Sequence, residues 1–291
     1  MKKFFMIGAA ALAFCAISCN KDNGENGGNG GSKKQEITVA KDALVFYQSF
    51  ENENATVGDV TLNTKGECTA DNFVQGRNGK CFQGGENQYL LYDVAENSAI
   101  RTMKAFTLSA WVKQPEIPRA QAPTPLYFQI CKNGETPDHF WGNLSFSIDR
   151  TDEGAGYLTY KTCFYHGADG SIWKTWNGDY ADCYPAGRWN HLIFMYDNAT
   201  SLYHVYVNGV EVTPDSAKAC EMSGAPAGDL AFADATQVVV GAWLPKVVDG
   251  ATDEWMGWMD NSQIDELRLF NRALTADEAS ELYKAEVANI D

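Results

Sequence analysis

Residues 202–212 read Leu202-Tyr203-His204-Val205-Tyr206-Val207-Asn208-Gly209-Val210-Glu211-Val212, a stretch that predicts a β-hairpin. The Asn-Gly pair stands between two runs rich in β-branched and aromatic residues, and it suits a tight turn that needs positive φ at both positions. The preceding residues 189–196 are apolar on both faces, as expected of a central strand that is covered on each side. An antiparallel sheet is therefore predicted here.

The same period-two pattern extends outward from this hairpin. In residues 106–113, Phe106, Leu108, Ala110 and Val112 share one face, which predicts a strand with one side in the core. Further strands are predicted at 44–50, 88–92, 126–131, 144–149, 157–165, 237–243 and 263–270. Many strands without alternating helices indicate an all-β sandwich or barrel.

One helix is predicted, at the end of the chain. Thr275 and Glu278 have the spacing of a capping box, and Ala279, Leu282 and Tyr283 give the following residues one apolar side.

Several blocks, in this order, resemble the laminin G-like, concanavalin A-like jelly roll. They are Val45-Phe46-Tyr47-Gln48-Ser49-Phe50-Glu51, Phe106-Thr107-Leu108-Ser109-Ala110-Trp111-Val112-Lys113, Gly187-Arg188-Trp189-Asn190-His191-Leu192, Tyr206-Val207-Asn208-Gly209, Gly257-Trp258-Met259-Asp260 and Ile264-Asp265-Glu266-Leu267-Arg268-Leu269-Phe270-Asn271-Arg272-Ala273-Leu274-Thr275. The resemblance implies a two-sheet antiparallel jelly-roll β-sandwich with a short C-terminal helix. Such domains frequently bind glycans and often hold a structural calcium. Fold alone does not decide function, because this architecture hosts lectins, adhesion modules and glycosidases.

The composition excludes some partners. The 291 residues contain 23 Lys and Arg against 38 Asp and Glu, a formal charge of −15. Binding to nucleic acid depends on Lys and Arg that release counterions from phosphates, so nucleic acid is not an expected partner.

The N-terminus predicts export and a lipid anchor. Met1-Lys2-Lys3 precedes an apolar run, and Ala16-Ile17-Ser18-Cys19 resembles a bacterial lipobox, in which the signal is cut before the cysteine and that cysteine is lipidated. We expect a signal peptide at 1–18, lipidated Cys19 with a Gly/Asn-rich tether at 19–35, and one laminin G-like domain at 36–291. The alternative is a soluble secreted protein that is cleaved near a cysteine.

This anchor predicts a cell-envelope location. The Lys-Asp-x-x-Glu stretch after Cys19 resembles signals of Bacteroidetes-type outer-membrane lipoproteins, which implies exposure at the cell surface, with a periplasm-facing protein as the alternative. The acidic chain offers no second attraction to anionic lipids, so contact with the bilayer is expected through the N-terminal anchor only.

Six cysteines remain beyond Cys19, and an even number in an exported chain suggests disulfides. Proximity in the sequence makes Cys68–Cys81 and Cys163–Cys183 the first pairings to consider among 15 possible sets. Six buried free thiols are the alternative.

Asp265 is the candidate metal ligand. At period two it shares a face with Leu267 and Leu269, where an ionised carboxylate is costly unless it is paired or bound to a metal. In similar proteins a calcium lies near this aspartate and the acidic residue after the first strand, here Glu51, and backbone carbonyls complete the shell. A buried ion pair with Arg268 or Arg272 is the alternative.

Carbohydrate binding needs flat aromatic faces beside planar polar groups. Such residues gather in segments of loop-like composition, and the candidate ligand-binding residues are Trp141, Trp173, Trp176, Asn177, Tyr180 and Trp255. By contrast, Trp111, Trp189 and Trp243 lie in strong strand patterns and are expected in the core.

The sequence favours binding over catalysis. Laminarinase-type glycosidases of this fold carry Glu-x-Asp-x-x-Glu or Glu-x-Asp-x-Glu, and neither pattern occurs. Adjacent carboxylates such as Asp265 and Glu266 are expected on opposite faces of a strand. The expected function is a cell-envelope lipoprotein that binds polysaccharide or host glycan without cleaving it. The alternatives are an adhesion or scaffold module that binds a protein, and a glycosidase with a non-standard carboxylate pair.

Overall fold

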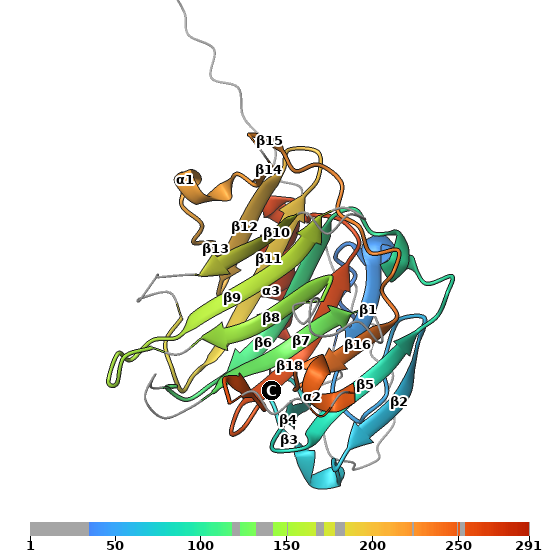
Figure 1. Ribbon diagram of the computed structural model, residues 1–291. Helices are drawn as coiled ribbons and strands as arrows, with labels where there is room; N and C mark the ends of the chain where they lie inside the picture. Colours follow the sequence, from blue (N-terminus) through green and yellow to red (C-terminus); the bar gives the residue numbers. More distant parts are fainter. Residues whose placement is uncertain are drawn as a thin grey trace, which may run out of the picture. The chain divides into compact units, whose positions relative to one another are not determined.

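The computed structural model describes residues 35–117, 123–131, 142–149, 151–166, 172–177, 184–222, 224–248, 250 and 254–290. They all fall within Lys34–Asp291, which folds as one unit. Among the described residues, two sheets of eight strands each lie face to face (Figure 1). The predicted all-β sandwich is therefore confirmed.

The first sheet has the order β13-β12-β11-β6-β18-β4-β3, and β1 also pairs with β18. Its strands are β1 (Leu44–Gln48), β3 (Phe73–Gln75), β4 (Lys80–Gln83), β6 (Phe106–Lys113), β11 (Trp189–Asp197), β12 (Leu202–Val207), β13 (Val210–Glu211) and β18 (Gln263–Phe270).

The second sheet has the order β10-β9-β8-β7-β16-β5-β2, and β17 pairs with β7 in the parallel sense. Its strands are β2 (Val60–Gly66), β5 (Gln88–Val94), β7 (Thr124–Cys131), β8 (Leu144–Asp149), β9 (Thr159–His166), β10 (Ile172–Asn177), β16 (Gln237–Val240) and β17 (Met256–Gly257). A separate small ladder joins β14 (Glu221–Met222) to β15 (Ala225–Pro226).

The α-helices are α1 (Asp215–Lys218), α2 (Leu244–Val248) and α3 (Ala276–Ala288), and the 3-10 helices are η1 (Lys41–Ala43), η2 (Ala70–Asn72) and η3 (Ala99–Thr102). No helix in the described ranges has the length and apolar character needed to cross a membrane.

The core lies between the sheets. Phe106, Leu108, Ala110 and Val112 of β6 are all buried in it, as the period-two pattern predicts. Aromatic rings from both sheets meet there, for example Phe146 and Phe194, whose centroids are 4.8 Å apart.

Both outer faces are also covered by side chains from other segments. Ala279 and Leu282 of α3 pack on Ile193 and Met195 of the first sheet. The predicted capping box is present, since Thr275 Oγ1 accepts from Glu278 N at 3.2 Å and Glu278 Oε2 accepts from Thr275 N at 2.8 Å. The second sheet is covered by Trp243, Leu244 and Met256.

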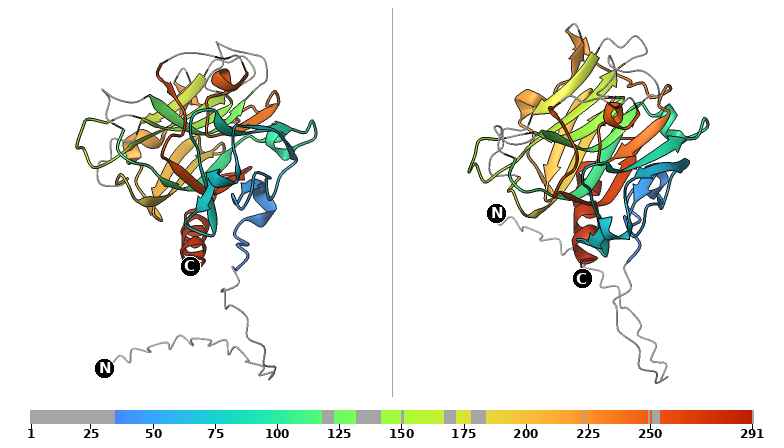
Figure 2. Two further views of the ribbon diagram at one scale, coloured as in Figure 1. Left: turned by 90° about the horizontal axis from the view of Figure 1, so that it is seen from below. Right: turned by 60° about the horizontal axis from the view of Figure 1, so that its bottom comes forward.

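The start of the domain lies beside its end. Gln35 N donates to Asn289 Oδ1 at 3.0 Å, and Asn289 Nδ2 donates to Gln35 O at 2.7 Å. Figure 2 shows the first described residues and α3 on the same side of the molecule. The chain therefore enters the domain next to the helix that covers the first sheet.

The predicted hairpin is confirmed, with φ of 51° at Asn208 and 80° at Gly209. Strands β2, β3, β4, β10, β14, β15 and β17 lie outside the predicted set. Three of these, β2, β3 and β10, lie at the ends of the two large sheets.

The period-two prediction for Asp265 is wrong because β18 contains a bulge. The register with β6 shifts between Asp265 and Arg268, and Glu266 has a φ of 52°. One extra residue at a bulge breaks the alternation. Ile264, Leu267 and Leu269 thus reach the core, and Asp265 shares no face with the two leucines.

The bulge also overturns the prediction that Asp265 and Glu266 point to opposite faces. Asn78 contacts both carboxylates: its backbone N donates to Asp265 Oδ2 at 2.9 Å, and its Nδ2 donates to Glu266 Oε1 at 3.2 Å. The two adjacent carboxylates therefore converge on one residue.

The predicted Cys68–Cys81 disulfide is wrong. Both residues are buried free thiols: Cys68 Sγ donates to Tyr89 O in the second sheet, whereas Cys81 lies in β4 of the first sheet. Proximity in the sequence misleads here because the chain changes sheets between them. Burial raises the pKa of Cys68 to about 11 and that of Cys81 to about 12, so both thiols stay protonated. Cys163 is buried in β9, and its predicted partner Cys183 lies outside the described residues.

Candidate functional site

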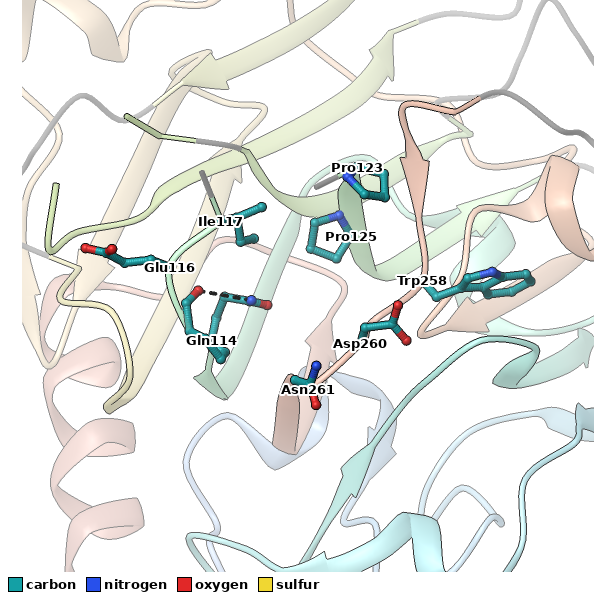
Figure 3. A pocket seen from close by; sticks show the side chains of 9 residues that line it. Gln114, Glu116, Ile117, Pro123, Pro125, Trp258, Asp260 and Asn261 are labelled. Atoms are coloured by element: carbon teal, nitrogen blue, oxygen red, sulfur yellow. Dashed lines mark hydrogen bonds between the residues drawn. The ribbon is translucent and has the colours of Figure 1, made fainter. Parts of the chain in front are cut away.

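A cleft of about 190 Å³ opens at one end of the sandwich, where β6 and β18 of the first sheet approach β7 and β17 of the second. Figure 3 shows the residues that line it. They are Gln114, Pro115, Glu116, Ile117, Pro123, Pro125, Trp258, Asp260 and Asn261. We call this site the Trp258 cleft.

The backbone around β17 fixes the position of Trp258. Thr124 N donates to Trp255 O at 2.8 Å, and β17 then runs parallel to β7 through Gly257. A Cβ at Gly257 would lie 2.9 Å from Thr124 O, so this close approach requires glycine. Met259 is fully buried directly after Trp258, and the indole is therefore held between two anchored residues.

The Trp258 indole is only partly buried. Its ring stacks beside Tyr89, with centroids 6.3 Å apart and an interplanar angle of 14°, and Lys246 Nζ lies 5.2 Å from its centroid. These neighbours restrict the ring to one orientation at the edge of the cleft.

Buried hydrogen bonds hold the amide of Gln114 at the floor of the cleft. Its Oε1 accepts from the hydroxyls of Tyr127 and Ser262, and its Nε2 donates to Pro115 O at 3.1 Å. Gln114 is only 4% exposed. The floor is therefore a polar group that is already oriented before any ligand arrives.

The rim of the cleft carries Asp260 and Asn261. Asn261 adopts a left-handed conformation with φ of 55°, which turns the chain directly after Asp260. Partial burial, followed by the neighbouring Glu86 carboxylate, raises the pKa of Asp260. Asp260 stands two residues after Trp258, and both line the cleft (Figure 3).

This arrangement places a partly exposed aromatic ring next to a carboxylate and two amides in one concave site. Aromatic rings contact the C–H faces of pyranoses, and planar polar groups bond to sugar hydroxyls. The Trp258 cleft therefore has the chemistry that carbohydrate binding requires.

Of the predicted ligand-binding residues, Trp255 is described but does not line this cleft. It is partly buried and packs edge-on against Trp243, with ring centroids 5.1 Å apart. It directly precedes β17, three residues before Trp258.

Trp173, Trp176 and Asn177 lie in the edge strand β10 rather than in a loop. They pair with Tyr165, Thr162 and Lys161 of β9. Trp141 and Tyr180 lie outside the described residues. A platform formed by these side chains stays a prediction.

The site residues that sequence reasoning missed are Trp258, Asp260, Asn261 and Gln114. The signal for them was present, because Trp258 stands in an indole-rich segment that ends in an Asp-Asn turn. Gln114 gave no signal, since it joins the others only through tertiary packing.

The residues predicted to be in the core are placed as follows. Trp111 and Trp243 are buried, and Trp189 is partly buried. Trp111 does not lie between the sheets. It packs against His191 of β11 and Tyr283 of α3, with centroid distances of 5.1 and 6.1 Å.

The predicted metal ligands approach the same turn from two sides. Asp265 is fully buried, and its Oδ2 accepts from Arg77 N at 2.8 Å and from Asn78 N at 2.9 Å. The exposed Glu51 accepts from Lys80 N at 3.3 Å. Burial, and then the charge of Glu266, raises the pKa of Asp265 to about 8.

Asp265 fits a calcium ligand in one respect, because its Oδ1 is buried and has no hydrogen-bond partner in the described part of the chain. The described residues contain no group of three or more His, Cys, Asp or Glu that could hold a metal ion. Calcium at Glu51 and Asp265 therefore remains a proposal, and the function proposed below does not depend on it.

The alternative ion pair of Asp265 with Arg268 or Arg272 is wrong. Arg268 is bonded to Glu266 and Glu286, with an Nη2–Oε2 distance of 2.5 Å to Glu266. Arg272 instead binds Glu278 through two bonds of 2.7 Å. The turn N–H groups satisfy Oδ2 of Asp265 in place of an arginine.

Residues 84–280 match the family described as the concanavalin A-like lectin/glucanases superfamily. This match covers more than half of the chain. The protein belongs to this superfamily. Among curated proteins, none matches the sequence.

Solved structures similar to this one are toxin binding domains. The binding domain of botulinum neurotoxin DC in complex with rat synaptotagmin II has a TM-score of 0.54 and 12% identity, covering 84% of this chain and 52% of that one. A structure of botulinum neurotoxin type C, whose cell entry depends on interaction with two ganglioside molecules, has a TM-score of 0.54 and 13% identity, covering 84% and 51%. The binding domain of Paraclostridial Mosquitocidal Protein 1 has a TM-score of 0.53 and 15% identity, covering 84% and 52%.

The chain thus spans about half the length of these structures. At 12–15% identity the likeness shows the fold alone.

Proposed function

We propose that this protein is a lipid-anchored module of the bacterial cell envelope that binds polysaccharide or host glycan in the Trp258 cleft without cleaving it. The observation that carries the proposal is the partly exposed Trp258 ring beside Asp260, Asn261 and Gln114. The family, whose description names lectins, also supports it.

The position of the chain's entry point agrees with an anchored binding module. Gln35 is bonded to Asn289 after α3, which covers the first sheet, whereas Trp258 packs with side chains that cover the second. A tether from Cys19 would join the domain beside α3. The Trp258 side of the domain would then be free to meet an extracellular ligand.

The test is glycan binding by residues 19–291, expressed without the signal so that no lipid is attached. Binding to a glycan array identifies the ligand, and calorimetry with the strongest hit then compares variants. Trp258→Ala should weaken binding at least tenfold, since tenfold corresponds to about 1.4 kcal/mol. Trp258→Phe should lose less affinity than Trp258→Ala because phenylalanine keeps an aromatic face.

Tyr283→Ala is the matched control, because it removes a partly buried aromatic ring from α3 on the other sheet. It should leave glycan affinity unchanged even if it lowers the melting temperature. The pair Trp173→Ala and Trp176→Ala tests the β10 platform in the same assay. Unchanged binding by folded Trp258→Ala would contradict the proposed site.

Two alternatives give different results in this experiment. An empty array together with capture of a protein partner would favour an adhesion or scaffold module, and the synaptotagmin complex of one structural neighbour is the precedent. Shortened products from any bound polysaccharide would show a glycosidase instead.

A further inference from the structure

The charged side chains that line the Trp258 cleft are both acidic. Within the described lining, Glu116 and Asp260 carry carboxylates, and no Lys or Arg is present. Glu86 adds a third carboxylate close enough to Asp260 to act on it electrostatically. A ligand in this cleft therefore meets negative charge from more than one element.

The two acidic side chains of the lining have different neighbours. Asp260 is exposed, and a Cβ added at Gly85 would lie 3.7 Å from its Oδ1, so the segment before Glu86 runs beside it. Glu116 is fixed, since its Oε1 accepts from Gly156 N. A fixed carboxylate interacts with a bound charge without first losing side-chain entropy.

Lys246 is a described cation beside Trp258. Its Nζ lies over the Trp258 ring, 5.2 Å from the centroid, and Lys246 does not line the cleft. Within the described lining the formal charge is therefore negative, as is that of the whole chain at −15.

We propose that the Trp258 cleft selects against sugars with acidic groups and binds sugars that carry an ammonium group most tightly. Asp260 is the residue that sets this selectivity. The inference rests on the proposed function. A sugar stacked beside Trp258 brings its substituents next to the Asp260 carboxylate. There an ammonium group is attracted and a carboxylate is repelled. Sialylated and uronic-acid glycans are therefore excluded.

The experiment compares three tetrasaccharides with the same β-1,4-linked gluco backbone: the glucosamine tetramer, cellotetraose and the glucuronic acid tetramer. Binding to residues 19–291 is measured near pH 6, where the glucosamine amine and the glucuronic acid carboxylate are both charged. Sialylated and desialylated pairs on the glycan array extend the comparison to other sugars. We expect the ammonium form to bind at least tenfold more tightly than the carboxylate form, and the difference to shrink in 0.5 M salt.

Asp260→Asn should reduce this ratio several-fold while the affinity for cellotetraose changes little. Asp260→Lys should reverse the preference. Glu254→Gln is the matched control, since it removes one exposed carboxylate from the same segment without touching the lining. It should leave the ratio unchanged.

The outcomes separate this inference from the proposed function. If acidic sugars bind as tightly as ammonium sugars or more tightly, and Trp258→Ala still abolishes binding, the proposed selectivity is wrong but the glycan site stands. Binding of none of the sugars overturns both. If Glu254→Gln changes the affinity ratio as much as Asp260→Asn does, the selectivity comes from the net charge of the protein and the role assigned to Asp260 is wrong.

Discussion

At the scale of the residue, His191 shows how burial decides the charge of a side chain. It is 1% exposed between Trp111 and Tyr283, and its Nε2 shares a hydrogen bond of 2.9 Å with Ser109 Oγ. Burial, and to a lesser extent the charge of Arg268, lowers the pKa of His191 to about 3. His191 is thus packed, as its strand pattern predicts, and neutral.

The neutral His191 makes stability depend on pH. The unfolded chain takes up a proton near pH 6.5 and the folded chain does not until about 3, so stability is complete above pH 6.5 and falls as the pH drops. The loss should be about 2 kcal/mol between pH 6.5 and pH 5. Urea unfolding of wild type and His191→Gln across this range measures it. Parallel curves for the two proteins would contradict the prediction.

At the scale of the element, α3 closes the outer face of the first sheet, and its first turn sets where it begins. Thr275 caps the helix, and Arg272 together with Thr275 lowers the pKa of Glu278 to about 2. The apolar side of α3 then falls on Ile193 and Met195. A local sequence signal here agrees with the tertiary packing.

Removing the cap should weaken this docking. Thr275→Ala leaves the Glu278 N–H without its acceptor and should cost about 1 kcal/mol of unfolding free energy. Lys284→Ala, an exposed position on the same helix, should change stability by less than about 0.5 kcal/mol. Denaturant unfolding compares the two variants. A cost for Lys284→Ala equal to that for Thr275→Ala would show that capping is not the cause.

At the scale of the whole molecule, the turn between β3 and β4 connects distant parts of the chain. Its Arg77 and Asn78 bond to Asp265 in β18, and Lys80 bonds to Glu51 after β1. A calcium ion at Glu51 and Asp265 would stabilise this junction of three segments, because an ion that binds only the folded state raises its stability.

The proposed ion is tested by thermal unfolding. With calcium the melting temperature should be several degrees higher than with EDTA. Asp265→Asn keeps the shape and an acceptor for the turn N–H groups, and it should remove the calcium effect. Equal melting of wild type in calcium and EDTA would exclude the ion, and magnesium in place of calcium controls for ionic strength.

The sequence by itself determined the features that depend on neighbouring residues. The alternation in β6, the positive-φ turn at Asn208-Gly209 and the capping box at Thr275 are each set by local geometry, and each is confirmed. The order of the motifs was sufficient for the superfamily.

Only the tertiary structure decided the features that depend on register and on contacts distant in the sequence. The bulge in β18 brings Asp265 and Glu266 together, because one inserted residue reverses the alternation that a sequence pattern assumes. Cys68 and Cys81 are close in the chain, but Cys68 follows β2 and bonds to Tyr89 O of the second sheet, whereas Cys81 lies in β4 of the first, so both are free thiols. The Trp258 cleft joins Gln114 to the segment from Trp258 to Asn261, some 140 residues later in the chain. Only the packing of the two sheets brings these groups to one site.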